Sequence, residues 1–190
     1  MKNDKQKRRS IRLKDYDYAQ AGAYFVTICT HQHVCLLGEI VESKMVLNEF
    51  GRIVQEEWMK TEQLRPNVSC GKFVVMPNHF HGILIINYDG RGVLQYARTQ
   101  YARTPSAPTG FKAPSQTIGA IVRGFKSAVT KQINQHRQTP GQKFWQRNYY
   151  DHIIRNEDDF QRINGYIENN PLKWELDALN PANGDNKWRK

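Results

Sequence analysis

Residues 72–87 read KFVVMPNHFHGILIIN, which is two apolar runs separated by a short segment that contains Pro77, Asn78, His79 and His81. Both runs have the length of a strand and are rich in β-branched or aromatic residues, which favours strands. Pro77 and Asn78 favour a turn before the histidines. We therefore predict two consecutive strands, Lys72–Met76 and Gly82–Asn87.

Upstream of this pair, the sequence predicts one strand and one helix. Tyr24–Thr30 (YFVTICT) is dense in β-branched and aromatic residues and predicts a buried strand. In Leu47–Gln63, apolar residues recur at intervals of three and four, which indicates an amphipathic helix. This helix is expected to begin near Asn48 and to end before Pro66.

Downstream, we predict a helix at Thr117–Gln135, a strand at Tyr149–Arg155 and a last helix opened by Asn156 and ended at Asn170-Pro171. Strands and helices in this order predict an α+β fold. The simplest arrangement is a ferredoxin-like antiparallel sheet with helices on one face. Such a fold by itself assigns no function.

The chain of 190 residues has room for one domain with additions at its ends. We expect a basic N-terminal arm at residues 1–20, a domain at 21–175 and a C-terminal tail at 176–190. Gln95–Thr99 is repeated at once as Gln100–Thr104, followed by turn-forming residues. This duplication predicts a flexible insertion at about residues 90–115.

The charge favours a nucleic-acid partner. The net charge is +10, and residues 90–150 contain ten Lys or Arg and no acid. A solvated surface normally mixes both signs, although a solvated basic face remains the alternative. The residues expected to contact DNA are Arg8, Arg9, Arg12, Arg123, Lys126, Lys131 and Arg147.

Three cysteines form no CxxC pair and are odd in number, so neither a disulfide framework nor a zinc ribbon is expected. Reduced thiols fit a cytoplasmic protein. The longest apolar runs are about the length of a strand, so the sequence predicts no membrane span and no membrane partner.

His79-Phe80-His81 places two imidazoles on one side of an extended backbone, where both could bind one metal ion. Two histidines leave other coordination positions open for a third ligand and for phosphate oxygens. His31-Gln32-His33 has the same spacing, but it lacks the turn and the strand that flank the later pair. We therefore assign the metal to His79 and His81.

The segment Val75–Ile83 (VMPNHFHGI) resembles the HUH block of single-tyrosine transposases, in which U is a bulky apolar residue. Phe144–Glu157 (FWQRNYYDHIIRNE) and Tyr166–Pro171 (YIENNP) resemble signatures of the REP-associated tyrosine transposases. Together with the first strand, the resemblance covers roughly residues 24–174. The duplicated insertion and the long arm depart from the pattern.

The resemblance implies an enzyme that nicks and rejoins single-stranded DNA, with hairpin or palindromic DNA as substrate and Mg2+ or Mn2+ as cofactor. It implies Tyr166 as the catalytic nucleophile, which would hold the 5′ phosphate, and Asn170 as the third metal ligand beside His79 and His81. The spacing agrees, because residues four apart share one side of a helix. Tyr149 and Tyr150 are the other tyrosines of this C-terminal block.

The resemblance also implies a prokaryotic, nucleoid-associated protein and allows a homodimer. Two alternatives remain open. One is a non-catalytic binder of single-stranded nucleic acid that stacks bases on its sheet, although no RNP-like aromatic motif is present. The other is a domesticated transposase that binds its hairpin without transposing.

Overall fold

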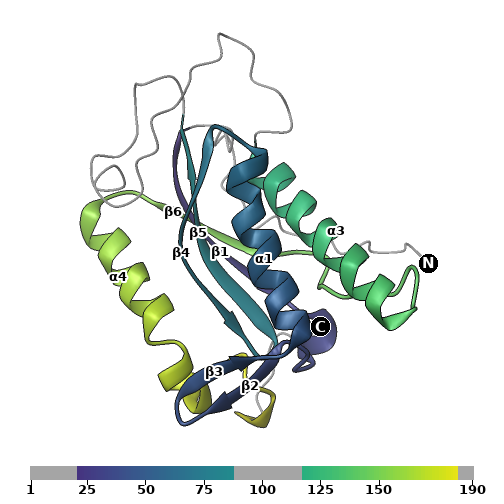
Figure 1. Ribbon diagram of the computed structural model, residues 1–190. Helices are drawn as coiled ribbons and strands as arrows, with labels where there is room; N and C mark the ends of the chain where they lie inside the picture. The colour runs from purple at the N-terminus through teal and green to yellow at the C-terminus, as the bar shows by residue number, and fades with distance from the viewer. Residues whose placement is uncertain (1–20, 88–116, 184–190) are drawn as a thin grey trace, which may run out of the picture.

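The computed structural model describes residues 21–87 and 117–183 (Figure 1). The elements are β1 (Gly22–Cys29), η1 (His31–His33), β2 (Gly38–Val41), β3 (Lys44–Leu47), α1 (Glu49–Leu64), β4 (Val68–Met76), β5 (His79–Ile86), α3 (Ile118–Arg137), β6 (Tyr150–Ile154), α4 (Glu157–Glu168), η3 (Pro171–Leu176) and η4 (Pro181–Asn183). The predicted helices and strands are confirmed, with small shifts of their ends. The predicted arm and insertion lie outside the described residues.

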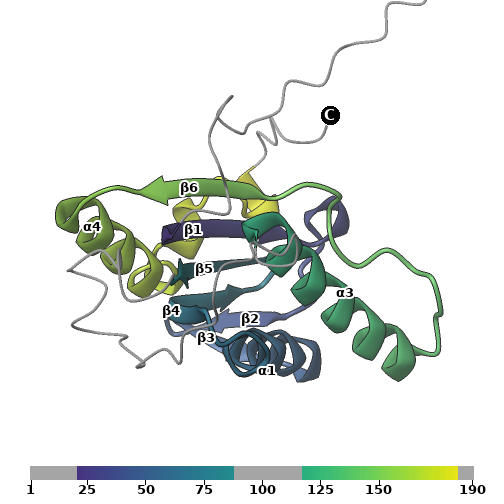
Figure 2. The ribbon, with the colours of Figure 1, turned by 90° about the horizontal axis from the view of Figure 1, so that it is seen from above.

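The main sheet has four strands in the order β4-β5-β1-β6, and Figure 2 shows this order across the sheet. Neighbouring strands are antiparallel. With α1 and α3 as the two crossover helices, this is the predicted ferredoxin-like arrangement. The pairing places Thr27 of β1 opposite both His81 of β5 and Tyr150 of β6, so the three residues form one row across the sheet.

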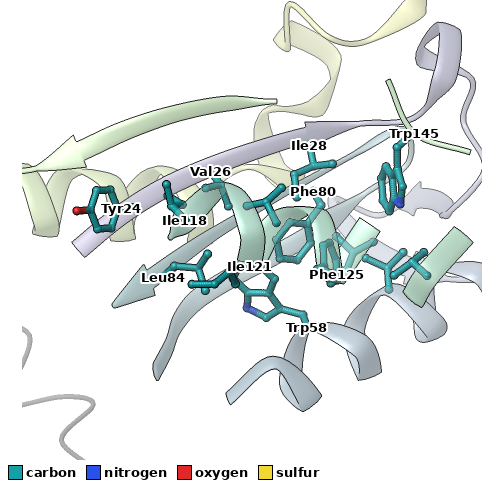
Figure 3. Packing of buried hydrophobic residues seen from close by; sticks show 14 of the residues in the cluster. Tyr24, Val26, Ile28, Trp58, Phe80, Leu84, Ile118, Ile121, Phe125 and Trp145 are labelled. Carbon is teal, nitrogen blue, oxygen red and sulfur yellow. The ribbon is translucent and has the colours of Figure 1, made fainter. Parts of the chain in front are cut away.

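One face of the sheet packs against α1 and α3. Alternate residues of β1 point to this side, and so does Phe80 of β5, whose ring centroid lies 4.5 Å from that of Trp58 on α1 (Figure 3). The apolar stripe of α3 that the sequence predicted, including Ile121 and Phe125, is buried there. This cluster is the larger part of the core.

The last helix, α4, differs from the prediction that helices cover one face. It packs on the opposite face, where Phe160, Ile163 and Ile167 contact the other alternate residues of the strands. Figure 1 shows α4 on one side of the sheet and α1 and α3 on the other. The reason is that β5 is apolar on both sides, so its second face also needs a cover. The second face carries the candidate site.

Three further features bear on the predictions. The chain adds a small hairpin, β2-β3, before α1, which the sequence analysis did not predict. The three cysteines are free thiols, as expected. Within the described residues, no helix is long and apolar enough to cross a membrane.

Candidate active site

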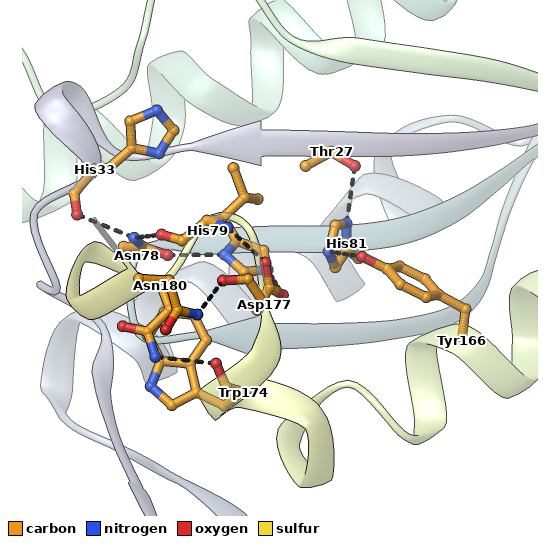
Figure 4. Close-up of polar contacts among 11 residues, drawn as sticks. Thr27, His33, Asn78, His79, His81, Tyr166, Trp174, Asp177 and Asn180 are labelled. Atoms are coloured by element: carbon orange, nitrogen blue, oxygen red, sulfur yellow. Dashed lines mark hydrogen bonds and ion pairs between the residues drawn. The ribbon is translucent and has the colours of Figure 1, made fainter. Parts of the chain in front are cut away.

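His79 and His81 lie at the start of β5, on the face that α4 covers, and both side chains are buried. Their ring centroids are 4.5 Å apart. The strand alternation predicted from the sequence is what brings them together, because Phe80 between them points into the opposite core. Figure 4 shows the two imidazoles side by side.

Asn78 sets the orientation of the His79 ring. Its side-chain nitrogen donates to the carbonyl oxygens of His33, at 3.0 Å, and Leu179, at 2.7 Å. The remaining oxygen of the amide lies 2.8 Å from Nδ1 of His79 and can only accept. Nδ1 of His79 therefore carries the ring proton, and Nε2 keeps a free lone pair.

His81 is held in a similar way. Its Nδ1 lies 2.8 Å from Oγ1 of Thr27, and its ring stacks on Phe25 with the centroids 5.2 Å apart. On the other side of the ring, Nε2 lies 3.2 Å from the hydroxyl of Tyr166. Metal-binding histidines usually have one ring nitrogen held by a hydrogen bond in this way, and a metal at Nε2 of His81 would take the place of its contact with Tyr166.

Burial keeps both histidines neutral. Desolvation lowers the pKa of His81 to about 3. Desolvation, helped by the neighbouring His81, also lowers the pKa of His79 well below its usual value. Since only a neutral imidazole can bind a metal, both side chains are in the competent state at neutral pH.

Asn170 and Asp177 complete the cluster. The Asn170 side chain is buried just after α4, and its Oδ1 has no hydrogen-bond partner among the described residues; the same is true of Nε2 of His79. Oδ2 of Asp177 lies 3.9 Å from Nε2 of His79. That distance is too long for a hydrogen bond and suits two ligands of one ion.

Ligand atoms of His79, His81 and Asp177 lie within 4.8 Å of one another, so these residues could hold a metal ion. Buried polar atoms without partners are costly, and a cation bound among them would satisfy the orphaned nitrogen and oxygen together. The donor set therefore fits a divalent metal. Two imidazoles alone favour a transition metal, while the oxygens of Asp177 and Asn170 also suit Mn2+ or Mg2+.

Asp177 is the site residue that sequence reasoning missed. It lies in the segment expected to be a C-terminal tail, and no motif marks it. The chain after α4 turns back over the histidines, with the ring of Trp174 6.0 Å from that of His79. The side chain of Asn180 donates to the carbonyl of Trp174 and helps to fix this segment (Figure 4).

Tyr166 is on α4, and its hydroxyl reaches the cluster while 44% of the residue stays exposed. Burial and the nearby charge of Asp177 raise the pKa of the phenol, and a hydrogen bond with Asn170 opposes this rise. Lys126, one of the residues expected to contact DNA, lies on α3, and its Nζ donates to the carbonyl oxygens of Gln146, at 2.6 Å, and Arg147, at 3.1 Å.

The described residues that were expected to contact DNA share one surface. Arg123, Lys126, Lys131 and Arg147 line a groove of about 990 Å³ between α3 and the segment that leads to β6. Lys143 also lines it, and none of the lining residues is acidic. Three of the four expected residues are exposed, whereas Lys126 is partly buried. Arg8, Arg9 and Arg12 lie outside the described residues.

The other histidine pair is not built as a site. His33 is buried, with Nε2 2.6 Å from the side-chain nitrogen of Gln146, and its carbonyl oxygen accepts from Asn78. His31 lies at the edge of a separate shallow pocket. Through its hydrogen bond with Asn78, His33 therefore helps to hold His79 in place. The spacing of His31 and His33 alone did not indicate this role.

The fold, an antiparallel sheet with two histidines side by side on one strand, can be compared with solved structures. The structure of a REP-associated tyrosine transposase bound to a REP hairpin matches with a TM-score of 0.51 and 20% sequence identity, over 87% of this chain and 74% of that chain. This likeness shows that the two proteins share their fold.

No protein-family model matches the chain. An uncharacterized protein of Haemophilus influenzae is 43% identical over 176 residues, which is 90% of this chain and 92% of that protein. The chain belongs to the same family as this Haemophilus protein.

Proposed function

We propose that the protein is a metal-dependent single-stranded DNA nuclease and strand transferase of the HUH transposase kind, with Tyr166 as its nucleophile. The observation that carries the proposal is the approach of the Tyr166 hydroxyl to Nε2 of His81, at 3.2 Å. A tyrosine nucleophile has to be open to the substrate and close to the proposed metal ligands, and the Tyr166 phenol meets both conditions.

In this proposal, His79, His81, Asn170 and Asp177 hold a divalent ion, Mg2+ or Mn2+. The ion supplies positive charge that polarises the phosphate and stabilises the charge that develops on its oxygens. Thr27 and Asn78 hold the two imidazoles through hydrogen bonds at Nδ1, so that both Nε2 atoms face the site.

The proposed reaction is a transesterification. The oxygen of Tyr166 attacks the phosphorus of a phosphodiester, and the bond from phosphorus to the 3′ oxygen breaks. The 5′ phosphate remains on the tyrosine. The phenol proton passes to water, which the exposure of Tyr166 allows, and the leaving 3′ oxygen takes a proton from water. Attack by another 3′ hydroxyl reverses these steps and joins two strands.

Hairpin DNA is the proposed substrate. The solved transposase with this fold was bound to a REP hairpin. On this chain, the groove lined by Arg123, Lys131 and Arg147 offers cations without acids, which suits a phosphate backbone. A homodimer would fit the proposal but is not required by it.

The test is the covalent adduct. Single strands that contain palindromes and carry a 3′ label, so that the labelled part keeps the 5′ phosphate, are incubated with the full chain and Mn2+, Mg2+ or chelator and run on a denaturing gel. We expect a labelled protein band with metal, no band from Tyr166→Phe, and normal bands from Tyr149→Phe and Tyr150→Phe. Peptide mapping should place the DNA on Tyr166.

Tight binding of the strands without an adduct under any metal condition would instead support the alternative, a non-catalytic or domesticated single-strand binder. An adduct on Tyr149 or Tyr150, or an undiminished adduct from Tyr166→Phe, would overturn the assignment of the nucleophile.

A further inference from the structure

Two aromatic side chains stand out by their exposure. Among the described residues, Tyr150 and Tyr166 are the aromatic residues with high exposure, 46% and 44%. The other described aromatic rings are buried or partly buried. An exposed ring next to a candidate active site needs a reason, because burial in the core would stabilise the fold more.

Both exposed rings lie against the same buried side chain, Phe25. Its ring centroid is 6.5 Å from that of Tyr150 and 5.9 Å from that of Tyr166, and both pairs are edge-to-face. Phe25 also stacks on His81. Tyr150 and the proposed nucleophile Tyr166 therefore share Phe25 as a neighbour.

The register explains why Tyr150 faces the site. Tyr150 pairs with Thr27, which pairs with His81, so the three side chains lie in one row on the α4 side of the sheet. Tyr149, the adjacent residue, points the other way and packs against the core under α1 and α3. β6 is an edge strand of the sheet as far as the described residues show, so the space beside Tyr150 is not covered by another strand.

We propose that the Tyr150 ring is a platform on which one nucleobase stacks, a base within a few nucleotides of the phosphate that Tyr166 attacks. The inference rests on the proposed function and names a residue that positions its substrate. Stacking on an exposed aromatic ring accepts any base, and a ring that contacts the same Phe25 as the nucleophile can hold the strand in line for attack.

The chemistry of the row favours a base over a phosphate as the ligand of Tyr150. Its neighbours in the row and beneath it are Thr27 and Phe25, neither of which is cationic, whereas the phosphate-binding charges lie in the groove beside α3. A hydroxyl contact to phosphate would depend on the oxygen of Tyr150. Stacking depends on the ring alone, so the two can be separated by mutation.

The test measures equilibrium binding in chelator, where no metal-dependent cleavage interferes. The probe is a fluorescently labelled palindromic single strand, chosen as the one that the full chain binds most tightly in the same titration. It is accompanied by a series in which one nucleotide at a time is replaced by an abasic unit. The variants are Tyr150→Ala and Tyr150→Phe. Met59→Ala is the control, because Met59 on α1 has the same 46% exposure and lies on the other side of the sheet.

We expect Tyr150→Ala to weaken binding of the intact strand about tenfold, and Tyr150→Phe and Met59→Ala to bind as the wild type does. One abasic position should weaken binding to the wild type by a similar factor and have no effect on binding to Tyr150→Ala. Equal loss for Tyr150→Phe and Tyr150→Ala would overturn stacking, and so would an abasic penalty that persists in Tyr150→Ala.

The two proposals can fail separately. If the adduct forms on Tyr166 but no abasic position is coupled to Tyr150, only the platform is wrong. If no adduct forms but the coupling is found, the platform stands in a protein that binds strands without cutting them.

Discussion

The side-chain oxygen of Asn78 lies 2.8 Å from Nδ1 of His79 and fixes which nitrogen of that ring carries the proton. The two other bonds of the Asn78 amide are donated to carbonyl oxygens, so the amide cannot turn around without losing both. The free lone pair on Nε2 of His79 is thus set by a neighbour that is not itself one of the candidate metal ligands.

Replacing Asn78 should weaken metal binding. We expect Asn78→Ala to lower Mn2+ affinity by about 10- to 100-fold, because His79 loses the acceptor that orients its ring. Asn78→Asp keeps an acceptor and should bind Mn2+ more tightly than Asn78→Ala. Affinity is measured by electron paramagnetic resonance of free Mn2+. Asn87→Ala, a buried amide at the far end of β5, is the control, and equal affinities for Asn78→Ala and Asn87→Ala would refute this role.

Asp177 should contribute charge to the same ion. Asp177→Asn keeps the shape of the side chain and removes its charge, so Mn2+ affinity should fall by at least about tenfold. Glu175→Gln serves as the control, since Glu175 is an exposed acid on the same segment. If both variants bind Mn2+ as the wild type does, Asp177 is not a ligand.

The buried histidines make stability depend on pH in the absence of metal. Burial lowers the pKa of His79 and of His81 in the folded chain. Below pH about 6.5, the unfolded chain therefore binds protons at these two histidines that the folded chain does not bind. The free energy of unfolding should therefore fall on acidification from pH 6.5 towards 3, by up to about 1.4 kcal/mol per pH unit for each histidine.

Urea unfolding in chelator at several pH values measures this dependence. His81→Gln removes one of the two groups, so its stability should change less steeply with pH than that of the wild type. Since other titrating groups are common to both proteins, they cancel in the comparison. Parallel curves for the two proteins would show that burial of His81 does not control the effect.

The groove beside α3 predicts a salt effect. If Arg123, Lys131 and Arg147 neutralise phosphates, the slope of log affinity against log salt for a single strand should become shallower by about 0.7 for each one replaced by alanine. Lys44→Ala, on the β2-β3 hairpin, should leave the slope unchanged. A wild-type slope in all three groove variants would mean that these cations form a solvated surface.

Much of the fold could be predicted because its signals are local. The alternation of buried side chains around His79-Phe80-His81 acts within a few residues of its strand. The same holds for the helix N-caps Asn48 and Asn156, whose side chains accept the expected backbone hydrogen bonds. The β2-β3 hairpin was missed because its turn uses Glu42 and Ser43 at positive φ, 47° and 61°, in place of the Asn-Gly that marks such turns.

The site was predictable only in part. Strand alternation brings His79 and His81 together, and helix periodicity points Tyr166 of α4 towards them. Asn170 was expected on the same helix but lies just beyond its end. Asp177 could not be found in this way, since its approach to His79 depends on how the chain turns after η3. The position of α4 on the second face also follows from tertiary packing, because an apolar stripe on a helix does not say which side of the sheet it will cover.

Lys126 was expected to contact DNA, and it lines the basic groove while its ammonium also has partners within the protein. Its ammonium donates to the carbonyls of Gln146 and Arg147, and burial lowers its pKa. Lys126→Met keeps the apolar stem but leaves two carbonyl oxygens without their hydrogen-bond donor. It should therefore reduce the free energy of unfolding by about 1–3 kcal/mol. Lys131→Met, on the exposed side of α3, should change it by less than about 0.5 kcal/mol. Urea denaturation measures both. If the two variants are equally stable and only Lys126→Met binds single strands more weakly, Lys126 contacts DNA and is not needed for the stability of the fold.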